Sequence, residues 1–514
     1  MNTLEDIIPK IKSNLKKFKK PGVLFVRPGF CMENGWPTKE KAIVAVTARN
    51  ARKIKLPSKI DGTPVEARPA TELEQFSHDH PEQFSRLADH RAEFRGTSLL
   101  PEFDPASESV KPPITPKVAA AHQTKVPLQY NPPNVPLDPV SGTIRMICHA
   151  SPDAGWPTLQ AFISGTRNRL KVSMYDFTSA HILNFFETNL AKTQVQLTLD
   201  DPPPNPTRDQ LDPVTVSSLQ KSIGKFTSAW ALVRSSPEAD TWLFPTAYHI
   251  KVMVRDSNTV WVSSGNLNNS NQPDIDPFGN PKPSDQGTAK ACDRDWHVVI
   301  ESPALARTFE AYLDNDFQVA ALHAANLSPA LKQPSASPLP RPSVIGNFNF
   351  VKAVSIDEAV TITPLLTPDS GVYQAALLNL IKTAKHSLFI QLQYIHPSSD
   401  PANAKFTELI DALAAQISGK KDVKIILSEF QKLKGGLDAL QAAGINLDNV
   451  RIQNNLHNKG FVFDHQKVVV SSMNWSGEGV LSNRDAGVII DNATAAKYYE
   501  RIFLDDWQNH AEQA

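Results

Sequence analysis

The chain has 514 residues, which is more than one hydrophobic core accommodates and predicts roughly three domains. Lys plus Arg (53) equal Asp plus Glu (53), so bulk charge is excluded as a means of binding nucleic acid or anionic membrane, although a local basic groove stays open. Hydrophobic residues (41%) suffice for globular packing, and no apolar run reaches the roughly 18 residues that a membrane span needs.

The spacing of the cysteines and the composition of the N-terminal segment bear on the cellular compartment in which the protein works. Cys31, Cys148 and Cys292 are widely separated and lack CxxC spacing, which disfavours a disulfide framework or a structural zinc site. The N-terminal segment has no apolar stretch of signal-peptide length. We therefore expect a protein of a reducing compartment, the cytoplasm.

Residues 1–96 predict a small α+β accessory unit. Val23–Val26 and Ala42–Thr47 are apolar runs typical of strands, and Glu72–Phe94 has the pattern of a helix. Three histidines on this helix are a weak signal for a metal site, so we predict a polar surface helix instead. These histidines are His78, His80 and His90.

The first twenty residues combine apolar side chains at helical spacing with a basic second half. This pattern predicts a helix that packs on its own domain. Contact of its basic side with a lipid surface or with phosphate groups is the alternative. The lysines are Lys10, Lys12, Lys16, Lys17, Lys19 and Lys20.

Two proline-rich segments, 97–140 and 328–345, predict linkers around a block at 141–327, and a second block at 346–514 follows. In both blocks apolar strands alternate with helices. This repeat predicts an α/β fold of two similar halves, each a mostly parallel sheet flanked by helices. The matching strands are Leu170–Phe177 and Val195–Asp200 in the first block, and Ser387–Ile395 and Val423–Ser428 in the second.

Late in each block the same polar residues recur at the same spacing. Counted from a histidine, a lysine follows at +2, an aspartate at +7, a serine at +15 and an asparagine at +17. The copies are His249, Lys251, Asp256, Ser264 and Asn266, and His457, Lys459, Asp464, Ser472 and Asn474. Alternate residues of a strand share a face, so each copy gathers an imidazole, an ammonium, a hydroxyl and an amide on one hairpin. This set suits an anion with several oxygens, such as phosphate.

This doubled pattern resembles the phospholipase D superfamily, whose signature is His-x-Lys-x4-Asp-x6-Gly-Ser-x-Asn twice in one chain. The similarity covers about residues 140–510, with the two halves expected to be related by a pseudo-twofold axis. Ser263 and Ser471 replace the glycine before each motif serine, and serine is small enough for the same close approach.

The resemblance implies a mechanism. One histidine attacks phosphorus and the other protonates the leaving oxygen, with the imidazoles facing each other about 5–7 Å apart. By the superfamily's usual order, His249 is the nucleophile and His457 the acid. Lys251 and Lys459 hold and stabilise the phosphate, and no metal or other cofactor is needed.

The resemblance also implies roles for the residues around the histidines and lysines. Ser264, Asn266, Ser472 and Asn474 are predicted to bind the phosphate oxygens. Asp295 and Asp485, each in an Arg-Asp step, are predicted to orient the histidines, and Asp256 and Asp464 to brace the hairpins.

Other residues carry weaker predictions. Tyr175 and Tyr394 end equivalent strands and either line the pocket or pack in the core. Trp296 and Trp475 are predicted to pack, and Cys292 lacks a nearby base. The stretch Asn268–Ala291 has no counterpart in the second half and is long enough to form a lid.

The motifs specify a phosphodiester and leave its substituents open. We expect hydrolysis or transfer of the phosphatidyl group of phospholipids, with peripheral membrane contact through residues 1–20. A nuclease is the main alternative, which the neutral net charge disfavours mildly, and a non-catalytic phosphate-binding module is a remote one.

Overall fold

The computed structural model describes residues 4–33, 36–48, 51, 54–70, 75, 78–79, 102–105, 109–111, 131–200, 210–231, 244, 247–323, 348–398, 400–419 and 421–514. The predicted linker 328–345, most of the linker 97–140 and most of the helix predicted at Glu72–Phe94 lie outside these residues. Of its three histidines only His78 is described, and it pairs with Asp79 at 3.0 Å.

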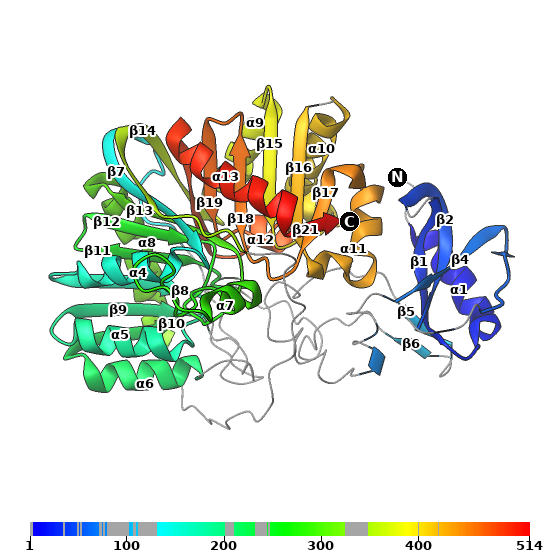
Figure 1. Ribbon diagram of the computed structural model, residues 1–514, viewed down its shortest axis with the longest axis horizontal. Helices are drawn as coiled ribbons and strands as arrows, with labels where there is room; N and C mark the ends of the chain where they lie inside the picture. Colours follow the sequence, from blue (N-terminus) through cyan, green and yellow to red (C-terminus); the bar gives the residue numbers. More distant parts are fainter. Residues whose placement is uncertain are drawn as a thin grey trace.

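The N-terminal unit is a six-stranded sheet in the order β3-β4-β2-β1-β5-β6. Its strands are β1 (Val23–Glu33), β2 (Trp36–Thr47), β3 (Lys59–Ile60), β4 (Thr63–Pro69), β5 (Glu102–Asp104) and β6 (Ser109–Lys111). The first residues form η1 (Leu4–Ile7), α1 (Ile8–Asn14) and η2 (Leu15–Phe18), whose apolar side is buried against this sheet. The unit lies beside α11 (Gly436–Ala442) in Figure 1, where Arg27 binds Asp438 at 2.5 Å.

The rest of the chain is built on one sheet in the order β10-β9-β8-β11-β12-β13-β7-β14-β20-β19-β18-β15-β16-β17-β21. The first half supplies β7 (Val140–Ser151), β8 (Arg169–Met174), β9 (Gln194–Leu199), β10 (Lys225–Trp230), β11 (Lys251–Arg255), β12 (Thr259–Ser263) and β13 (Asp295–Glu301). The second supplies β14 (Val354–Thr367), β15 (Ser387–Leu392), β16 (Asp422–Ser428), β17 (Val450–Gln453), β18 (Lys459–Phe463), β19 (Lys467–Ser471), β20 (Asp485–Asp491) and β21 (Ala511–Gln513). The long strands β7 and β14 pair antiparallel and join the halves in the middle of the sheet.

The α/β class and the two similar halves agree with the prediction, but the sheet is mixed rather than mostly parallel. Only the outer strands β8-β9-β10 and β15-β16-β17 run parallel. The central strands are antiparallel because β11–β12 and β18–β19 are hairpins whose neighbours β13 and β20 return in the opposite direction. Alternation of strands with helices implies parallel pairing, but each hairpin reverses the chain and so places antiparallel strands in the centre of the sheet.

Helices cover both faces of this sheet (Figure 1). Alternate residues of β11 show the two layers, because Val252 and Val254 face a core shared by both halves while Met253 faces a core of the first half alone. The shared core is covered by α8 (Pro303–His323) and α13 (Ala493–Asn509). The other face carries α4 (Gly155–Ser164), α5 (Ala180–Leu190) and α6 (Asp212–Ser222), and α9 (Val372–Thr383) and α10 (Ala404–Ser418).

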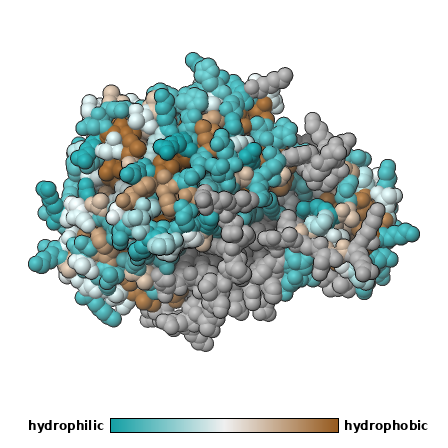
Figure 2. Space-filling view, in the orientation of Figure 1, coloured by the Kyte–Doolittle hydropathy of each residue, from teal (hydrophilic) through white to brown (hydrophobic). Residues whose placement is uncertain are grey.

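Short helices connect these layers. They are α7 (Asp285–Ala291), α12 (Gly477–Leu481), η5 (Asp369–Gly371), η6 (Pro401–Asn403), η7 (Glu429–Gly435) and η8 (Leu447–Asn449). In the part of the chain that the structure describes, no helix is both long and apolar enough to cross a membrane. Figure 2 shows a largely hydrophilic face with separate apolar patches, and Phe278, 37% exposed, is the one large hydrophobic side chain classed as exposed among the described residues.

Candidate active site

Both copies of the polar motif occupy the same place on their hairpins. Each histidine lies two residues before the strand that its lysine begins, so His249 precedes β11 and His457 precedes β18. At the far end of each hairpin, Asp256 and Asp464 adopt positive φ angles of 52° and 51°. The two motifs are therefore built by the same local geometry.

The carboxylates of Asp256 and Asp464 bind main chain rather than the site. Asp256 accepts the N–H groups of residues 167–169 at 2.8–2.9 Å, and Asp464 accepts those of residues 385–387 at 2.7–3.1 Å. Burial opposes ionisation, but these N–H groups outweigh it and hold the pKa of both carboxyls below their ordinary value. This geometry fits the bracing role predicted for both aspartates.

The two histidines are held by carboxylates of the opposite half. His249 Nδ1 lies 2.8 Å from Asp485 Oδ1, and His457 Nδ1 lies 3.0 Å from Asp295 Oδ1. All four residues are buried. A carboxylate on Nδ1 fixes the tautomer in which Nε2 carries the lone pair. Asp295 and Asp485 thus lie where orienting groups are needed, and each reaches across to the other motif.

Main-chain contacts impose this crossing. The N–H of Arg484 donates to the carbonyl of Ala247 at 3.0 Å, and the N–H of His457 donates to the carbonyl of Arg294 at 3.2 Å. Each Arg-Asp step therefore runs beside the histidine segment of the other half, and the following aspartate faces the imidazole.

The two histidine–lysine pairs differ in detail. Lys251 Nζ donates to the carbonyl of His249 at 2.7 Å, whereas Lys459 Nζ lies 3.0 Å from both ring nitrogens of His457. His249 Nε2 is buried without a hydrogen-bond partner among the described residues. Burial and then the ammonium of Lys251 lower the pKa of His249 to about 4, although Asp485 opposes them. His249 is therefore a neutral imidazole at neutral pH, with a free lone pair.

The two motif asparagines also present unsatisfied atoms. Asn266 Oδ1 and Asn474 Oδ1 are buried and have no hydrogen-bond partner among the described residues. A buried polar atom without a partner costs about 1–3 kcal/mol. Together with His249 Nε2, one such atom in each half points to a site completed by a polar ligand.

The motif serines bind the orienting aspartates. Ser264 Oγ donates to Asp295 at 2.7 Å, and Ser472 Oγ donates to Asp485 at 2.6 Å. A hydroxyl has one hydrogen to donate, and here it is directed to a carboxylate. The serines hold the orienting aspartates in this structure, and their binding of phosphate oxygens stays a prediction.

Two buried arginines, which the sequence analysis left without a role, join the halves behind the site. Arg294 binds Asp506 on α13 through two contacts of 2.8 and 3.0 Å, and Arg484 binds Asp316 on α8 at 2.7 Å. Each arginine also binds an aspartate of its own half, Asp153 for Arg294 and Asp369 for Arg484. Because each arginine precedes an orienting aspartate, these ion pairs fix the segments that carry Asp295 and Asp485.

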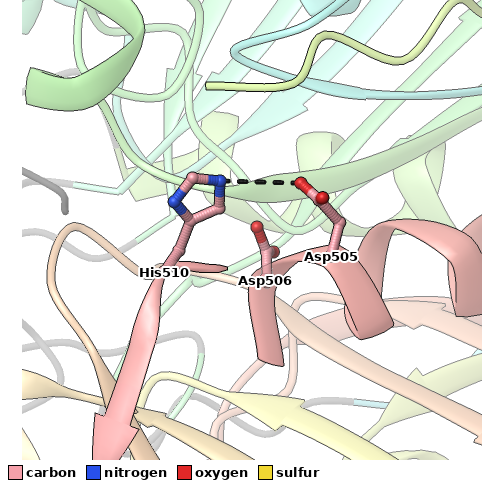
Figure 3. Close-up of side chains that lie close together, drawn as sticks. All are labelled: Asp505, Asp506 and His510. Carbon is pink, nitrogen blue, oxygen red and sulfur yellow. Dashed lines mark ion pairs between the residues drawn. The ribbon is translucent and has the colours of Figure 1, made fainter. Parts of the chain in front are cut away.

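One acidic cluster among the described residues has a spacing that a metal ion could use, Asp505, Asp506 and His510 (Figure 3). Asp506 is already engaged by Arg294, and Asp505 Oδ2 lies 3.5 Å from His510 Nε2. The cluster therefore fits the ion-pair network behind the site, and its side chains are directed to protein partners.

The register of the strands corrects the expected match of two tyrosines. Met174 pairs with Lys251 as Leu392 pairs with Lys459, so Tyr175 corresponds to Gln393 rather than to Tyr394. The ring of Tyr175 lies 5.0 Å from that of His249 and lines the site, whereas Tyr394 stacks on His396 at 4.0 Å.

The remaining predicted residues lie around the site. Trp296 packs on Tyr499, and Trp475 donates from Nε1 to the Tyr373 hydroxyl at 3.1 Å, so both tryptophans belong to the core. Cys292 Sγ contacts the carbonyl of Asn269 at 3.7 Å. The stretch Asn268–Ala291 contains α7 and packs on both halves, a position suited to a lid.

Comparison with known proteins bears on the second half. Residues 377–507 match the family model described as cardiolipin synthase, PLD-like domain. The chain carries a phospholipase D-like domain. The second motif lies within the matched residues, and the resemblance to the phospholipase D superfamily is confirmed. This superfamily assignment supports phosphodiester chemistry in general terms.

The chain is similar to several solved structures, and no curated protein matches it. The phosphatidylserine synthase of Haemophilus influenzae Rd KW20 is 12% identical over 71% of this chain and 87% of its own, with a TM-score of 0.43. Nuc of Salmonella typhimurium, a phospholipase D family member, is 20% identical over 30% of this chain and 99% of its own, with a TM-score of 0.25. A polyphosphate kinase of Porphyromonas gingivalis is 9% identical over 70% of this chain and 50% of its own, with a TM-score of 0.38.

Proposed function

We propose that this phospholipase D-like chain is a metal-independent phosphodiesterase that works through a phosphohistidine. The observation that carries the proposal is the crossed pairing of His249 with Asp485 and of His457 with Asp295. Beside these pairs, the buried Oδ1 atoms of Asn266 and Asn474 have no hydrogen-bond partner among the described residues. Two oriented imidazoles at one site supply a nucleophile and a general acid without a metal ion.

His249 is the proposed nucleophile. Its Nε2 has no hydrogen-bond partner among the described residues, its Nδ1 is fixed by Asp485, and its low pKa keeps the lone pair available. As Nε2 forms a bond to phosphorus, the bond from phosphorus to the leaving oxygen breaks. The positive charge that develops on the imidazole is stabilised by Asp485.

His457 is the proposed acid and then the base. It gives its proton to the leaving oxygen, and afterwards takes a proton from water or an alcohol that attacks the phosphohistidine and releases His249. Lys251, Lys459 and the amides of Asn266 and Asn474 bind the phosphate oxygens and stabilise the charge of the transition state.

Phospholipid is the favoured substrate class, through hydrolysis or transfer of a phosphatidyl group. The description of the matching family model, cardiolipin synthase, supports this choice. The formal net charge of +0 also favours it mildly over a nuclease, which gains affinity from positive charge along the strand.

The test is turnover by the purified chain in excess EDTA. Phosphatidylcholine, phosphatidylglycerol, cardiolipin, single-stranded DNA and double-stranded DNA are compared, with His249→Ala as control. We expect release of the head group or formation of a new phosphatidyl ester by the wild type alone. Turnover of DNA alone identifies a nuclease, binding without turnover identifies a phosphate-binding module, and loss of turnover on chelation contradicts the metal-independent mechanism.

For the contact of residues 1–20 with membranes, we propose an electrostatic mode. The apolar side of this segment is buried in its own unit, with Ile11 and Phe18 fully buried, so it cannot enter a bilayer. Lysines on the other side are exposed and suit anionic lipid. They are Lys12, Lys16, Lys17, Lys19 and Lys20. Vesicles of phosphatidylglycerol should sediment the protein at low salt and release it at high salt, and binding to neutral vesicles as well would contradict this mode.

A further inference from the structure

The two orienting aspartates, alike in their contacts to histidine and serine, differ at their second oxygen. Asp295 Oδ2 accepts a hydrogen bond of 2.8 Å from Asn271 Nδ2, a side chain of the insertion after the first motif. Asp485 Oδ2 is buried and has no hydrogen-bond partner among the described residues. One carboxylate is thus bound at both oxygens and the other at one.

Asn271 is placed by a turn that both halves share. Asn268 Oδ1 accepts the N–H of Asn271 at 2.9 Å, as Ser476 Oγ accepts the N–H of Gly479 at 3.1 Å. Gly479 is therefore the counterpart of Asn271. A Cβ at Gly479 would lie 2.3 Å from the carbonyl oxygen of Asn474, so the second half has no room for a side chain there.

Asn271 also reaches the phosphate-binding turn of its own half. Its Oδ1 accepts the backbone N–H of Asn266 at 3.0 Å, and its Nδ2 lies 3.2 Å from Asp293 Oδ2. The side chain is 1% exposed. One buried amide therefore ties the carboxylate that orients His457 to the backbone of a proposed phosphate ligand.

We propose that Asn271 is the positioning residue that makes the two histidines chemically different, an inference that rests on the proposed function. Every hydrogen bond to a carboxylate disperses its charge and weakens its hold on a neighbouring imidazolium. Asp295, with its additional donor, holds the proton of His457 more loosely than Asp485 would. Asn271 thereby helps His457 to release its proton to the leaving oxygen, while Asp485, without such a donor among the described residues, is the stronger partner for the charge that develops on His249 during attack.

This difference predicts a dependence on the leaving group. An acid matters little when the leaving oxygen is stable as an anion, and it matters most when that oxygen is strongly basic. Loss of Asn271 should therefore slow esters of poor leaving groups selectively. A residue that only supports the fold would slow all substrates by the same factor.

The experiment uses the full chain and methyl aryl phosphodiesters whose phenols range from 4-nitrophenol to phenol. Asn271→Gly copies the second half, and Asn271→Asp keeps the shape but places a charge beside Asp295. We expect kcat to fall less than about threefold for the nitrophenyl ester and about tenfold or more for the phenyl ester, which is part of what a general acid contributes. Asn271→Asp should show the same selectivity with larger losses.

Asn280→Gly is the matched control, because Asn280 is an exposed asparagine of the same insertion and should leave both rates unchanged. Thermal unfolding of each variant shows that the fold is kept, and Asn271→Asp provides the test if Asn271→Gly does not fold. Equal losses for both esters would overturn the role of Asn271. Absence of turnover by the wild type, or turnover that survives His249→Ala, would instead overturn the proposed function.

Discussion

The two halves of this chain share their order of elements and their motif, and they differ in the layer behind the motif. In the first half His297 lies opposite His149 in the sheet, and the corresponding pair in the second half is Gly487 and Leu365. His297 bonds the hydroxyls of Ser151 at 2.8 Å and of Ser263 at 2.7 Å, contacts that glycine cannot make.

The residues around the reacting atoms are therefore nearly the same in the two halves, whereas the residues packed behind them differ. Burial, and then the neighbouring His149, hold the pKa of His297 well below its ordinary value, so this support is polar but neutral. Identical side chains acquire different chemical roles when their surroundings differ, and the difference here lies behind Asp295 and Asp485.

The largest effect should come from the histidines. His249→Ala should lose about 10⁴-fold or more in turnover and form no phosphoenzyme, because the nucleophile is gone. His457→Ala should still form the phosphoenzyme from a nitrophenyl ester, which needs no acid. Rapid quench with labelled phosphate distinguishes the two, and label on His457 in the His249→Ala variant would reverse the roles.

The buried arginines should dominate stability in both halves. Arg484→Met leaves Asp316 and Asp369 buried without their cation and should lower the free energy of unfolding by about 3–5 kcal/mol. Arg294→Met should behave alike. Arg145, 57% exposed and 4.0 Å from Glu301, is the control, and Arg145→Ala should cost less than about 1 kcal/mol. Urea unfolding measures the free energy of unfolding of each variant. Equal decreases for the Arg484 and Arg145 variants would contradict the prediction.

The crossed orientation should appear as a pattern of coupling between halves. Asp485→Asn should lower formation of the phosphoenzyme about 10–100-fold, because His249 loses its orienting carboxylate. In a His457→Ala background with a nitrophenyl ester, Asp485→Asn should still lower the rate of phosphoenzyme formation by the same factor. Asp295→Asn should leave that rate almost unchanged, because the histidine that it orients is already absent. The reverse result would mean that each aspartate serves the histidine of its own half.

The smallest effect concerns stability at low pH. Burial lowers the pKa of His149 to about 3, so between pH 6.5 and 3 the unfolded chain binds a proton that the folded chain does not. Stability therefore falls as pH falls through this range. His149→Leu places the residue of the corresponding position in the second half, Leu365, at this site. It should reduce by about 2 kcal/mol the decrease in the free energy of unfolding between pH 7.5 and 5. Urea unfolding at both pH values tests this, and an unchanged pH dependence would contradict it.

Much of the candidate site follows from local spacing. The histidine, lysine, serine and asparagine of each motif occupy one hairpin, because alternate residues of a strand share a face and a tight turn returns the chain. Asp256 lies at that turn with a positive φ, whereas the N–H group of Asn168 that it binds is 88 positions away and is brought there by tertiary structure. The repeat of the pattern also indicated two similar halves.

Contacts between distant segments were decided by tertiary structure alone. His249 and Asp485 are 236 positions apart, and His457 and Asp295 are 162 apart, so no spacing within a motif indicates that they cross. The antiparallel centre of the sheet and the match of Tyr175 with Gln393 likewise depend on register. The sequence by itself determined which groups each half presents, because those lie within one hairpin. The docking of the halves determined which carboxylate each histidine meets and why only Asp295 is also bound by Asn271.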